Sequence, residues 1–350
     1  MIAWVLHGSR DLRREERPVP SPRADQVLVR VERVGICGSD VRYFQTGKVG
    51  PFTPTRPFVL GHEFSGEVVE VGSDAAGFAA GDRVAVDPAQ PCLRCELCRE
   101  GRSNLCDATR YYGSAASDPP VDGAFCELIA VPAANCYRLG GAVSYAMGAL
   151  LEPLGIATHA VQRAGALMGK PVVVSGGGPI GQLVATVAQA AGASFVAVGD
   201  PLAYPRSVAA ARVDHAFDPT AVSAATEISD LTRGGPAVVF EAAGAAASLE
   251  WALEHVRRGG RVVQIGHLPA PTSASLHLVM TRELEITGSF RLGSSGFAVG
   301  ATLVESGRIE IESLVSSVAS LDDVPAAIAA AADNDAEIKL QVSATGQGSC

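Results

Sequence analysis

Positive charge and long apolar segments are both scarce in this sequence. Its 350 residues hold 28 lysines and arginines against 37 acidic residues, a formal charge of −9, and no basic run interrupts this balance. Nucleic acid and other polyanionic polymers are therefore not expected as partners. No uninterrupted apolar stretch reaches the roughly 18 residues that a membrane-spanning helix needs, so we expect no membrane segment and no membrane partner.

The order of residues in a secretory signal is also missing from the start of the chain. Residues 1–5 are apolar and the arginines follow at 10–17, whereas a signal places its positive charge before the apolar region. We therefore expect a cytoplasmic protein, in which cysteines serve as thiolates and not as disulfides.

Cysteine is rare, yet four of the eight cysteines lie within one short segment. Their spacing suits tetrahedral zinc bound by four thiolates, and a closed site of this kind leaves no open position for chemistry. Because the flanking residues are polar, we expect the segment to lie outside the core, in a structural zinc lobe at 88–110. A disulfide pair is one alternative, and an iron–sulfur cluster is another. The bacterial ferredoxin pattern has a three-residue final gap before Cys-Pro, whereas here the gap is seven residues and Asp107 follows. The four expected zinc ligands are Cys92, Cys95, Cys98 and Cys106, and the expected free thiols are Cys126, Cys136 and Cys350.

The chain has two parts with different sequence patterns, and its length suggests about two domains. Up to about residue 148, short β-type runs at 27–31, 66–71 and 83–86 alternate with turn residues, which indicates a β-rich domain. Beyond it, strand-like runs alternate with helical stretches, which predicts a doubly wound parallel sheet. The expected strands are 172–175, 195–198, 237–241 and 261–265, and the expected helices are 206–212, 221–231, 248–257 and 321–332.

A glycine pattern follows the first of these later strands. Gly176, Gly178 and Gly181 fit G-x-G-x-x-G, and Pro179 and Ile180 complete the turn into the next helix. Such a turn brings backbone N–H groups to the pyrophosphate of a dinucleotide.

An acidic residue stands at the end of the next strand. Asp200 lies nineteen residues after Gly181, where it would bind a ribose 2′-hydroxyl and repel a 2′-phosphate, so NAD is favoured over NADP. Arg206 would soften this preference. The alternatives are a turn role for Asp200 before Pro201 and a nucleotide-free fold.

Three further motifs occur in a fixed order: Gly-Ile-Cys-Gly-Ser-Asp at 35–40, Gly-His-Glu at 61–63 and Glu-Pro-Leu at 152–154. Residues 61–75 fit the pattern G-H-E-x2-G-x5-G-x2-A. With these motifs the chain resembles the zinc-dependent medium-chain alcohol and polyol dehydrogenases. The resemblance implies a GroES-like catalytic domain at 1–148 and 288–350, and an inserted Rossmann domain at 149–287. It also implies two zinc ions per chain.

The resemblance further implies roles for individual residues. A lone Cys37 or His62 would ordinarily be a buried core residue, but the family places both on the catalytic zinc. Glu63 and Glu152 are the remaining candidate ligands, and which of them binds the metal directly is left open. In the same family Ser39 relays the substrate proton, Tyr43 faces the substrate, and Arg291 reaches the nicotinamide–substrate region.

The motifs between and after these ligands are closest to those of the sorbitol and L-idonate 5-dehydrogenases. Segments 45–50 and 112–115 resemble the L-idonate enzymes in particular. We therefore expect NAD-linked oxidation of a secondary hydroxyl of a polyol or sugar acid, with L-idonate first and sorbitol or xylitol as the near alternative. Threonine and glucose are more distant alternatives. A catalytically silent member with a binding or structural role and a zinc-free quinone reductase are the rival classes. The resemblance also implies a homo-oligomer, a tetramer or a dimer.

Overall fold

The computed structural model describes residues 1–332 and 336–345, and Cys350 lies outside this part of the chain. Residue contacts divide the chain into two compact units. Within the described residues, unit 1 comprises 1–152, 301–332 and 339–345, and unit 2 comprises 153–300 and 336–338. The sequence predicts domain boundaries at 148 and 287, and the contacts divide the chain at 152 and 300. Residues 148 and 287 remain a prediction for the limits of separately folding domains.

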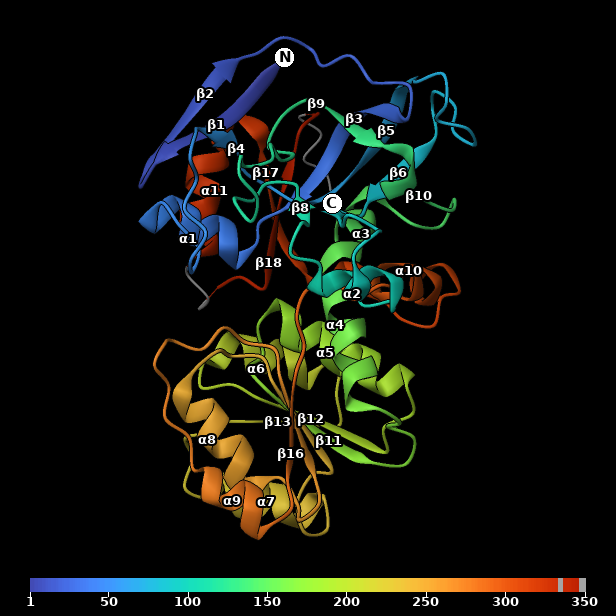
Figure 1. Ribbon diagram of the computed structural model, residues 1–350. Coiled ribbons are helices and arrows are strands. Elements are labelled where there is room, and N and C mark those ends of the chain that lie inside the picture. The colour runs from blue at the N-terminus through green and yellow to red at the C-terminus, as the bar shows by residue number, and fades with distance from the viewer. Residues whose placement is uncertain (333–335, 346–350) are drawn as a thin grey trace. The chain divides into compact units, whose positions relative to one another are not determined.

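Unit 1 is built around β-sheets with few and short helices (Figure 1). A seven-stranded sheet has the order β10-β6-β5-β3-β18-β17, and β9 also pairs with β3; β2-β1-β4 form a second sheet. The strands are β1 (Ile2–Gly8), β2 (Asp11–Glu16), β3 (Gln26–Gly35), β4 (Phe58–Val59), β5 (Glu63–Val71), β6 (Arg83–Val86), β7 (Ala89–Gln90), β8 (Arg110–Tyr111), β9 (Leu128–Pro132), β10 (Cys136–Arg138), β17 (Val315–Ser320) and β18 (Lys339–Ser343). Its helices are α1 (Gly38–Thr46), α2 (Glu96–Arg99), α3 (Tyr145–Ala149) and α11 (Val324–Ala331).

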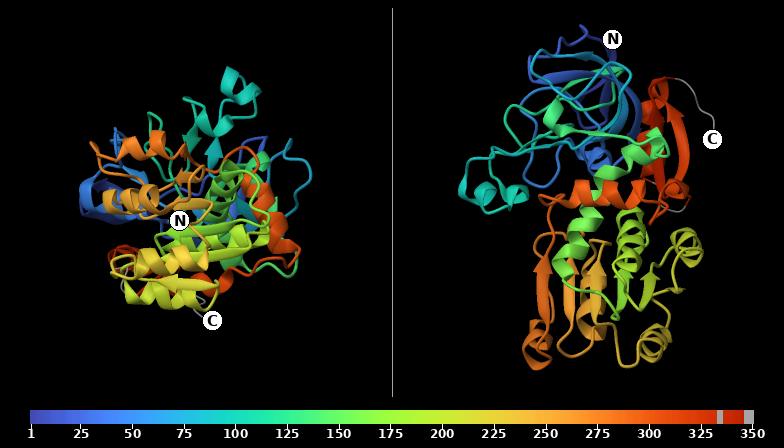
Figure 2. Two further views of the ribbon diagram at one scale, coloured as in Figure 1. Left: turned by 90° about the horizontal axis from the view of Figure 1, so that it is seen from below. Right: turned by 90° about the vertical axis from the view of Figure 1, so that its right-hand side faces the viewer.

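Alternate residues of the central strand β3 contribute to the core of unit 1. In β3, Val27, Val29 and Val31 are fully buried and belong to one hydrophobic cluster with β1, β5 and β9 residues. The cluster also takes in Ile328 of α11 and Val342 of β18, so the late segment of the chain completes the core of the first. The segment around α2 projects from the sheets of unit 1 as a separate lobe (Figure 2).

Unit 2 contains a six-stranded parallel sheet of order β13-β12-β11-β14-β15-β16, the Rossmann order 3-2-1-4-5-6. Its strands are β11 (Pro171–Ser175), β12 (Phe195–Gly199), β13 (His215–Phe217), β14 (Val238–Glu241), β15 (Arg261–Gln264) and β16 (Glu285–Gly288). Its helices are α5 (Pro179–Ala190), α6 (Ala203–Ala210), α7 (Ala224–Leu231), α8 (Ala246–His255) and α9 (Leu276–Thr281), while α4 (Leu151–Ala164) and α10 (Gly296–Glu305) include residues of both units.

The sequence explains the layers of unit 2. Alternate residues of the central strands, Val173, Val239 and Val262, are fully buried in one cluster with apolar residues of α7 and α8. Helix α5 is buried along residues 181–188, and its apolar side chains there include Leu183, Val184 and Val187. The predicted α/β class, a GroES-like β-rich domain with a Rossmann sheet, is confirmed. None of the helices in the described residues has the length and apolarity to cross a membrane.

Candidate functional site

The four clustered cysteines come together in the lobe of unit 1. The sulfur atoms of Cys92, Cys95, Cys98 and Cys106 all lie within 4.8 Å of one another. Backbone N–H groups donate to two of these sulfurs: Cys95 N to Cys92 Sγ and Cys92 N to Cys106 Sγ, both at 3.4 Å. Such N–H donors, first among them Arg94 N, lower the pKa of Cys92 to about 6. The seven cysteines that the structure describes are free, which removes the disulfide alternative for these four.

A second cluster lies where β3 and β5 pair. The register sets Gly35 opposite Glu63, so the residues just beyond β3 meet those at the start of β5. As a result the ligand atoms of Cys37, His62 and Glu63 lie within 4.8 Å of one another. His62 and Glu63 are 6% and 2% exposed, a burial that polar and charged groups tolerate only with partners.

Asp40 supports this cluster and is itself fully buried. Its carboxylate accepts hydrogen bonds from Cys37 N (2.9 Å) and Gly61 N (3.2 Å), which ties both ligand segments to one group. Asp40 Oδ1 is 3.7 Å from His62 Nδ1. Burial alone would lower the pKa of His62, but the charges of Asp40 and Cys37 outweigh it and hold that pKa well above its usual range.

Glu63 also has a buried cationic partner. Lys339 Nζ forms an ion pair with Glu63 Oε2 and donates a hydrogen bond to the carbonyl of Ile36 at 2.8 Å. Burial would lower the pKa of Lys339, but the charge of Glu63 outweighs this and raises it. The lysine therefore enters the cluster as a cation.

Glu152 lies beside the cluster but is not one of the three mutually close ligands. It occupies the first turn of α4, and its Oε1 accepts a hydrogen bond from the hydroxyl of Tyr111 at 2.6 Å. The ring of Tyr111 meets that of His62 edge-on, with centroids 5.8 Å apart. Burial raises the pKa of Glu152 to about 7, although the charge of His62 opposes the shift.

The donor sets of both clusters fit zinc, which binds thiolate, imidazole and carboxylate ligands. In the second cluster His62 Nδ1 is buried and accepts or donates no hydrogen bond within the described residues. Glu63 Oε2 is also buried, and its partner among the described residues is Lys339. A divalent cation would compensate these buried groups. Three protein ligands would leave one of its coordination positions open to a further group.

The remaining predicted residues of the catalytic set lie in different surroundings. Ser39 is half-buried in the first turn of α1. Tyr43, on the same helix, is 2% exposed and packs edge-on against Phe58, with its hydroxyl accepting a hydrogen bond from Ala115 N at 3.0 Å. Tyr43 is therefore a core residue of unit 1, and its burial does not favour the predicted contact with substrate. Arg291 belongs to unit 2, where its guanidinium lies 4.7 Å from the ring centroid of Phe290.

The glycine turn of unit 2 has the geometry that dinucleotide binding requires. Gly176 has a φ of +106°, and a Cβ at Gly181 would lie 1.8 Å from Gly176 O, so neither position tolerates a side chain. A Cβ at Gly178, by contrast, would meet nothing within 4 Å, which leaves the helix start open to a ligand. Gly178 caps α5 and Pro179 is in its first turn, followed by Ile180. The free N–H groups there suit a pyrophosphate.

Asp200 lies beside this turn because β11 and β12 are neighbouring parallel strands. Its Oδ2 accepts a hydrogen bond from Gly177 N (2.7 Å) and its Oδ1 one from Leu202 N (2.8 Å), so the carboxylate is held at the edge of the loop. Arg206 donates to the carbonyls of Asp200 and Pro201 at 2.9 and 2.7 Å. It is also 3.4 Å from Asp218, so its guanidinium is already bound to groups of the chain.

Sequence reasoning missed three residues of the second cluster: Asp40, Tyr111 and Lys339. Asp40 carried a signal, because it stands three residues after Cys37 and forms a capping box with it at the start of α1. Tyr111 and Lys339 carried none, since their partners are distant in the chain; Lys339 and Ile36 are separated by 303 residues.

The β-rich unit with two zinc-type clusters and the Rossmann unit with its glycine turn together define a zinc-dependent dehydrogenase that acts on CH–OH groups with a nicotinamide nucleotide. Residues 23–141 match the family model of the alcohol dehydrogenase GroES-like domain, and residues 179–306 match that of the zinc-binding dehydrogenases. The chain belongs to this family of zinc-binding alcohol and polyol dehydrogenases.

Similar proteins agree with this assignment. The chain is 38% identical over 330 residues to a probable D-xylulose reductase A of Neosartorya fischeri, covering 92% of this chain and 91% of the relative. Among solved structures, L-idonate 5-dehydrogenase from Escherichia coli K-12 matches with a TM-score of 0.92 at 31% identity, covering 98% of both chains. A putative zinc-binding dehydrogenase from Sinorhizobium meliloti, bound to NADP, matches with a TM-score of 0.89 at 34% identity, covering 98% and 99%.

Proposed function

We propose that this chain catalyses the reversible NAD-linked oxidation of a secondary hydroxyl of a polyol or sugar acid to the ketone. The observation that carries the proposal is the buried Cys37–His62–Glu63 cluster in a member of the zinc-binding dehydrogenase family. The D-xylulose reductases at 36–38% identity support a polyol and ketose as the substrate pair. A small-molecule substrate accounts for the whole of this chemistry, and no nucleic acid or membrane partner is needed.

Cys37, His62 and Glu63 would hold the catalytic zinc, and Cys92, Cys95, Cys98 and Cys106 the structural one. When bound, the catalytic zinc supplies Lewis acidity that can lower the pKa of a hydroxyl by about nine units, worth roughly 12 kcal/mol, against roughly 3–5 kcal/mol from a general base alone.

The chain's own groups position these ligands and move the proton. Asp40 fixes the segments that carry Cys37 and His62 through its two backbone hydrogen bonds. The hydroxyl of Ser39, two residues after the ligand cysteine, would receive the substrate proton. Glu152, held by Tyr111, would keep a carboxylate beside the cluster as an alternative ligand to Glu63.

Two substrates are favoured by separate observations. The pair xylitol and D-xylulose is favoured by the higher sequence identity, 38%, and L-idonate, the substrate that the motifs predict first, by the structural match at a TM-score of 0.92. Absorbance of the reduced nicotinamide across xylitol, sorbitol, L-idonate, gluconate, threonine and glucose separates them. If only threonine or glucose reacted, the proposed substrate class would be wrong.

The metal assignment is tested by Cys37→Ala. We expect metal analysis to fall from two zinc ions per chain to one, and hydride transfer to be lost, because the variant keeps only the lobe site. Cys126→Ala, a buried thiol outside both clusters, is the matched control and should keep both ions. Normal turnover by Cys37→Ala would exclude the mechanism.

The NAD preference rests on the position of Asp200. Asp200→Asn keeps an oxygen that can accept a backbone hydrogen bond but removes the charge that repels a 2′-phosphate. We expect the ratio of kcat/KM for NAD over NADP to fall at least about tenfold, a change of about 1.4 kcal/mol. Unchanged selectivity in Asp200→Asn would show that Asp200 does not bind the ribose. Unchanged selectivity in Arg206→Gln would show that Arg206 does not weaken the preference for NAD.

A homo-oligomer, tetramer or dimer, belongs to the proposal as well. β16 ends the order of the sheet in unit 2, and its Ile286 is 43% exposed, as Phe290 beyond it is at 42%. An edge strand presents backbone N–H and C=O groups that can pair with another chain, and the exposed Ile286 and Phe290 would be covered by such a contact. Light scattering during gel filtration measures the assembly. The cytoplasmic location, which the free cysteines support, is tested by cell fractionation.

A further inference from the structure

A cavity in unit 1 is lined by four arginines from three segments of the chain. Its volume is about 320 Å³, and Cys37, His62 and Glu63 are not among its lining residues. One acidic residue, Asp122, lies among those lining residues. The arginines are Arg17, Arg23, Arg56 and Arg110. This local excess of positive charge stands out in a chain whose formal charge is −9.

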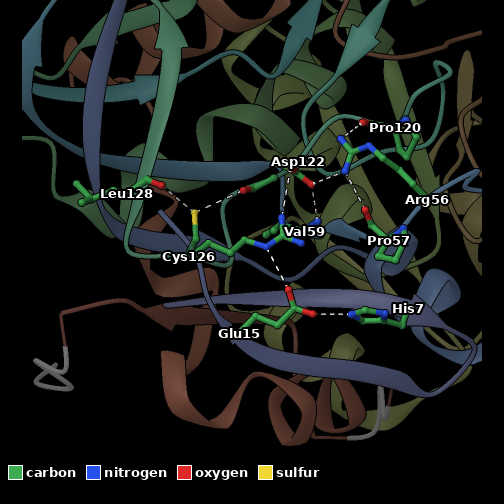
Figure 3. Close-up of polar contacts among 11 residues, drawn as sticks. His7, Glu15, Arg56, Pro57, Val59, Pro120, Asp122, Cys126 and Leu128 are labelled. Atoms are coloured by element: carbon green, nitrogen blue, oxygen red, sulfur yellow. Dashed lines mark hydrogen bonds and ion pairs between the residues drawn. The ribbon is translucent and has the colours of Figure 1, made fainter. Parts of the chain in front are cut away.

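Asp122 holds one side of the cavity in a fixed arrangement (Figure 3). Its Oδ1 accepts a hydrogen bond from Val59 N at 3.0 Å and lies 3.5 Å from Arg56 Nη1, while its Oδ2 lies 3.6 Å from Arg17 Nη1. Arg56 Nη2 also donates to the carbonyl of Pro120 at 2.7 Å. Both guanidinium groups are therefore positioned before any ligand arrives, which reduces the entropy that binding would cost.

The other two arginines are held less firmly, and of these two only Arg23 has an ion-pair partner among the described residues. Arg110 makes no ion pair with any residue that the structure describes, and the carboxylate nearest to Arg23 is that of Asp25, at 3.8 Å. Gln26, 8% exposed, also lines the cavity; its Oε1 accepts a hydrogen bond from Arg23 N at 3.0 Å. The side-chain nitrogen of Gln26 donates to no described group and is a further donor for a ligand.

We propose that this cavity binds a small dianion or trianion built from carboxylate or phosphate groups. Arg110 supplies a charge that is unpaired within the described residues, and Arg23 is only weakly compensated because the side chains of its pair with Asp25 are 70% and 67% exposed. The planar guanidinium donors match carboxylate and phosphate oxygens in pairs. Arg17 is paired with both Glu15 (3.2 Å) and Asp122 (3.6 Å), and Arg56 with Asp122, so these two arginines are compensated and contribute positioned donors more than net charge. The volume suits a compact metabolite, since small-molecule sites begin at about 300 Å³, and it excludes a polymer.

The test measures binding by titration calorimetry on the zinc-loaded protein with saturating NAD, so that the glycine turn of unit 2 is already occupied. The probes are tricarballylate, which carries carboxylates, and glycerol 2-phosphate, which carries a phosphate; acetate and glycerol are the references. We expect at least one probe to bind in low salt, both references to fail, and the affinity to fall when salt is added.

Variants locate the site within the protein. Arg23→Gln combined with Arg110→Gln should weaken the bound probe at least tenfold. Arg257→Gln combined with Arg308→Gln changes the net charge equally at exposed positions outside the cavity, and it should leave binding unchanged. Asp122→Asn keeps the oxygen that accepts from Val59 N but removes the one acid, so it should tighten binding several-fold.

Three results would overturn the proposal: no binding of either probe, equal weakening in both arginine pairs, or an affinity that Asp122→Asn lowers. Dehydrogenase activity measured on the Arg23 and Arg110 double variant should stay at the wild-type level, because neither residue belongs to the proposed catalytic set. A failure of this site is therefore distinct from a failure of the proposed function.

Discussion

Lys339 is the cation on which the buried charge of Glu63 depends. Replacing it with methionine leaves a carboxylate that is 2% exposed without its ion-pair partner. Breaking a buried pair in this way costs about 3–5 kcal/mol. We expect that loss in Lys339→Met when a chelator is present, and a smaller loss with added zinc, because a divalent cation at Glu63 would replace the missing charge.

Urea unfolding in chelator and in zinc measures this difference, with Lys48→Met as the control because Lys48 is exposed. The control should change the free energy of unfolding by less than about 0.5 kcal/mol. Equal losses for Lys339→Met in both conditions would show that the lysine acts independently of the metal.

Asp87 gives the stability of the protein a dependence on pH that can be isolated. Burial raises the pKa of Asp87 to about 6, although the hydrogen bond from Ala89 N opposes the shift. Because the folded state binds the proton more tightly than the unfolded state, stability falls as pH rises from about 4 to about 6, and the cost persists above that range.

Asp87→Asn keeps an acceptor for Ala89 N and removes the charge. It should raise the free energy of unfolding by about 3 kcal/mol near pH 7.5 and leave it nearly unchanged near pH 4. Urea unfolding at both pH values measures the effect, with Asp230→Asn on the exposed side of α7 as the matched control. A gain of the same size at both pH values would contradict the assignment.

At the scale of elements, the four central strands of the Rossmann sheet were predictable, whereas its edge strands β13 and β16 and several helices were not. Each central strand is a short run of buried β-branched residues that ends at glycine or a turn, as in Val172–Val174 before Ser175 and Gly176. Helix α1 was missed because its sequence was interpreted as a ligand motif. Helix α4 was missed for the same reason, because Glu-Pro-Leu at its start was interpreted as a ligand motif; proline is tolerated in the first turn of a helix.

The candidate site was predictable to the extent that its residues lie in local motifs. Cys37, His62 and Glu63 stand in short patterns, and strand pairing then brings them together. Lys339 and Tyr111 could not be predicted, because their roles arise from contacts between segments that are distant in the chain and carry no spacing signal. Tyr43 stays a prediction as a substrate contact, since its position close to a ligand cysteine does not determine where its side chain lies, and it is buried against Phe58.

The zinc lobe is an element whose fold we expect to depend on its metal. Cys106→Ser removes the buried ligand of the four, so the lobe should lose its zinc and become open to proteolysis at 88–110. Metal analysis should give one zinc per chain. Freshly prepared variant should keep activity within about threefold of wild type, because structural zinc has no open position for chemistry.

Cys136→Ser is the control for this variant, because its half-buried thiol is outside both clusters and should affect neither zinc nor proteolysis. Immediate loss of all activity in Cys106→Ser, with the lobe still resistant to protease, would assign the cluster a catalytic role instead.

At the scale of the whole molecule, each unit has a hydrophobic core of its own. One cluster gathers residues of β1, β3 and β5 with Val342, and another gathers Val173, Val239 and Leu253 with their neighbours. The residues assigned to the metals lie in unit 1, and the glycine turn with Asp200 lies in unit 2. Each ligand should therefore stabilise the unit that contains its residues first.

Hydrogen exchange followed by mass spectrometry can measure this directly. NAD at about 100 times its Kd should stabilise unit 2 by about 2.7 kcal/mol, slowing exchange roughly 100-fold in the peptides around Gly176–Asp200 wherever exchange requires that unit to open. A zinc chelator should speed exchange around 37–63 and 92–106 without the same change in β11 and β12. Equal protection of every core strand by NAD would show instead that the chain opens as one cooperative unit, because a ligand bound to one part would then raise the free energy of opening for all of it.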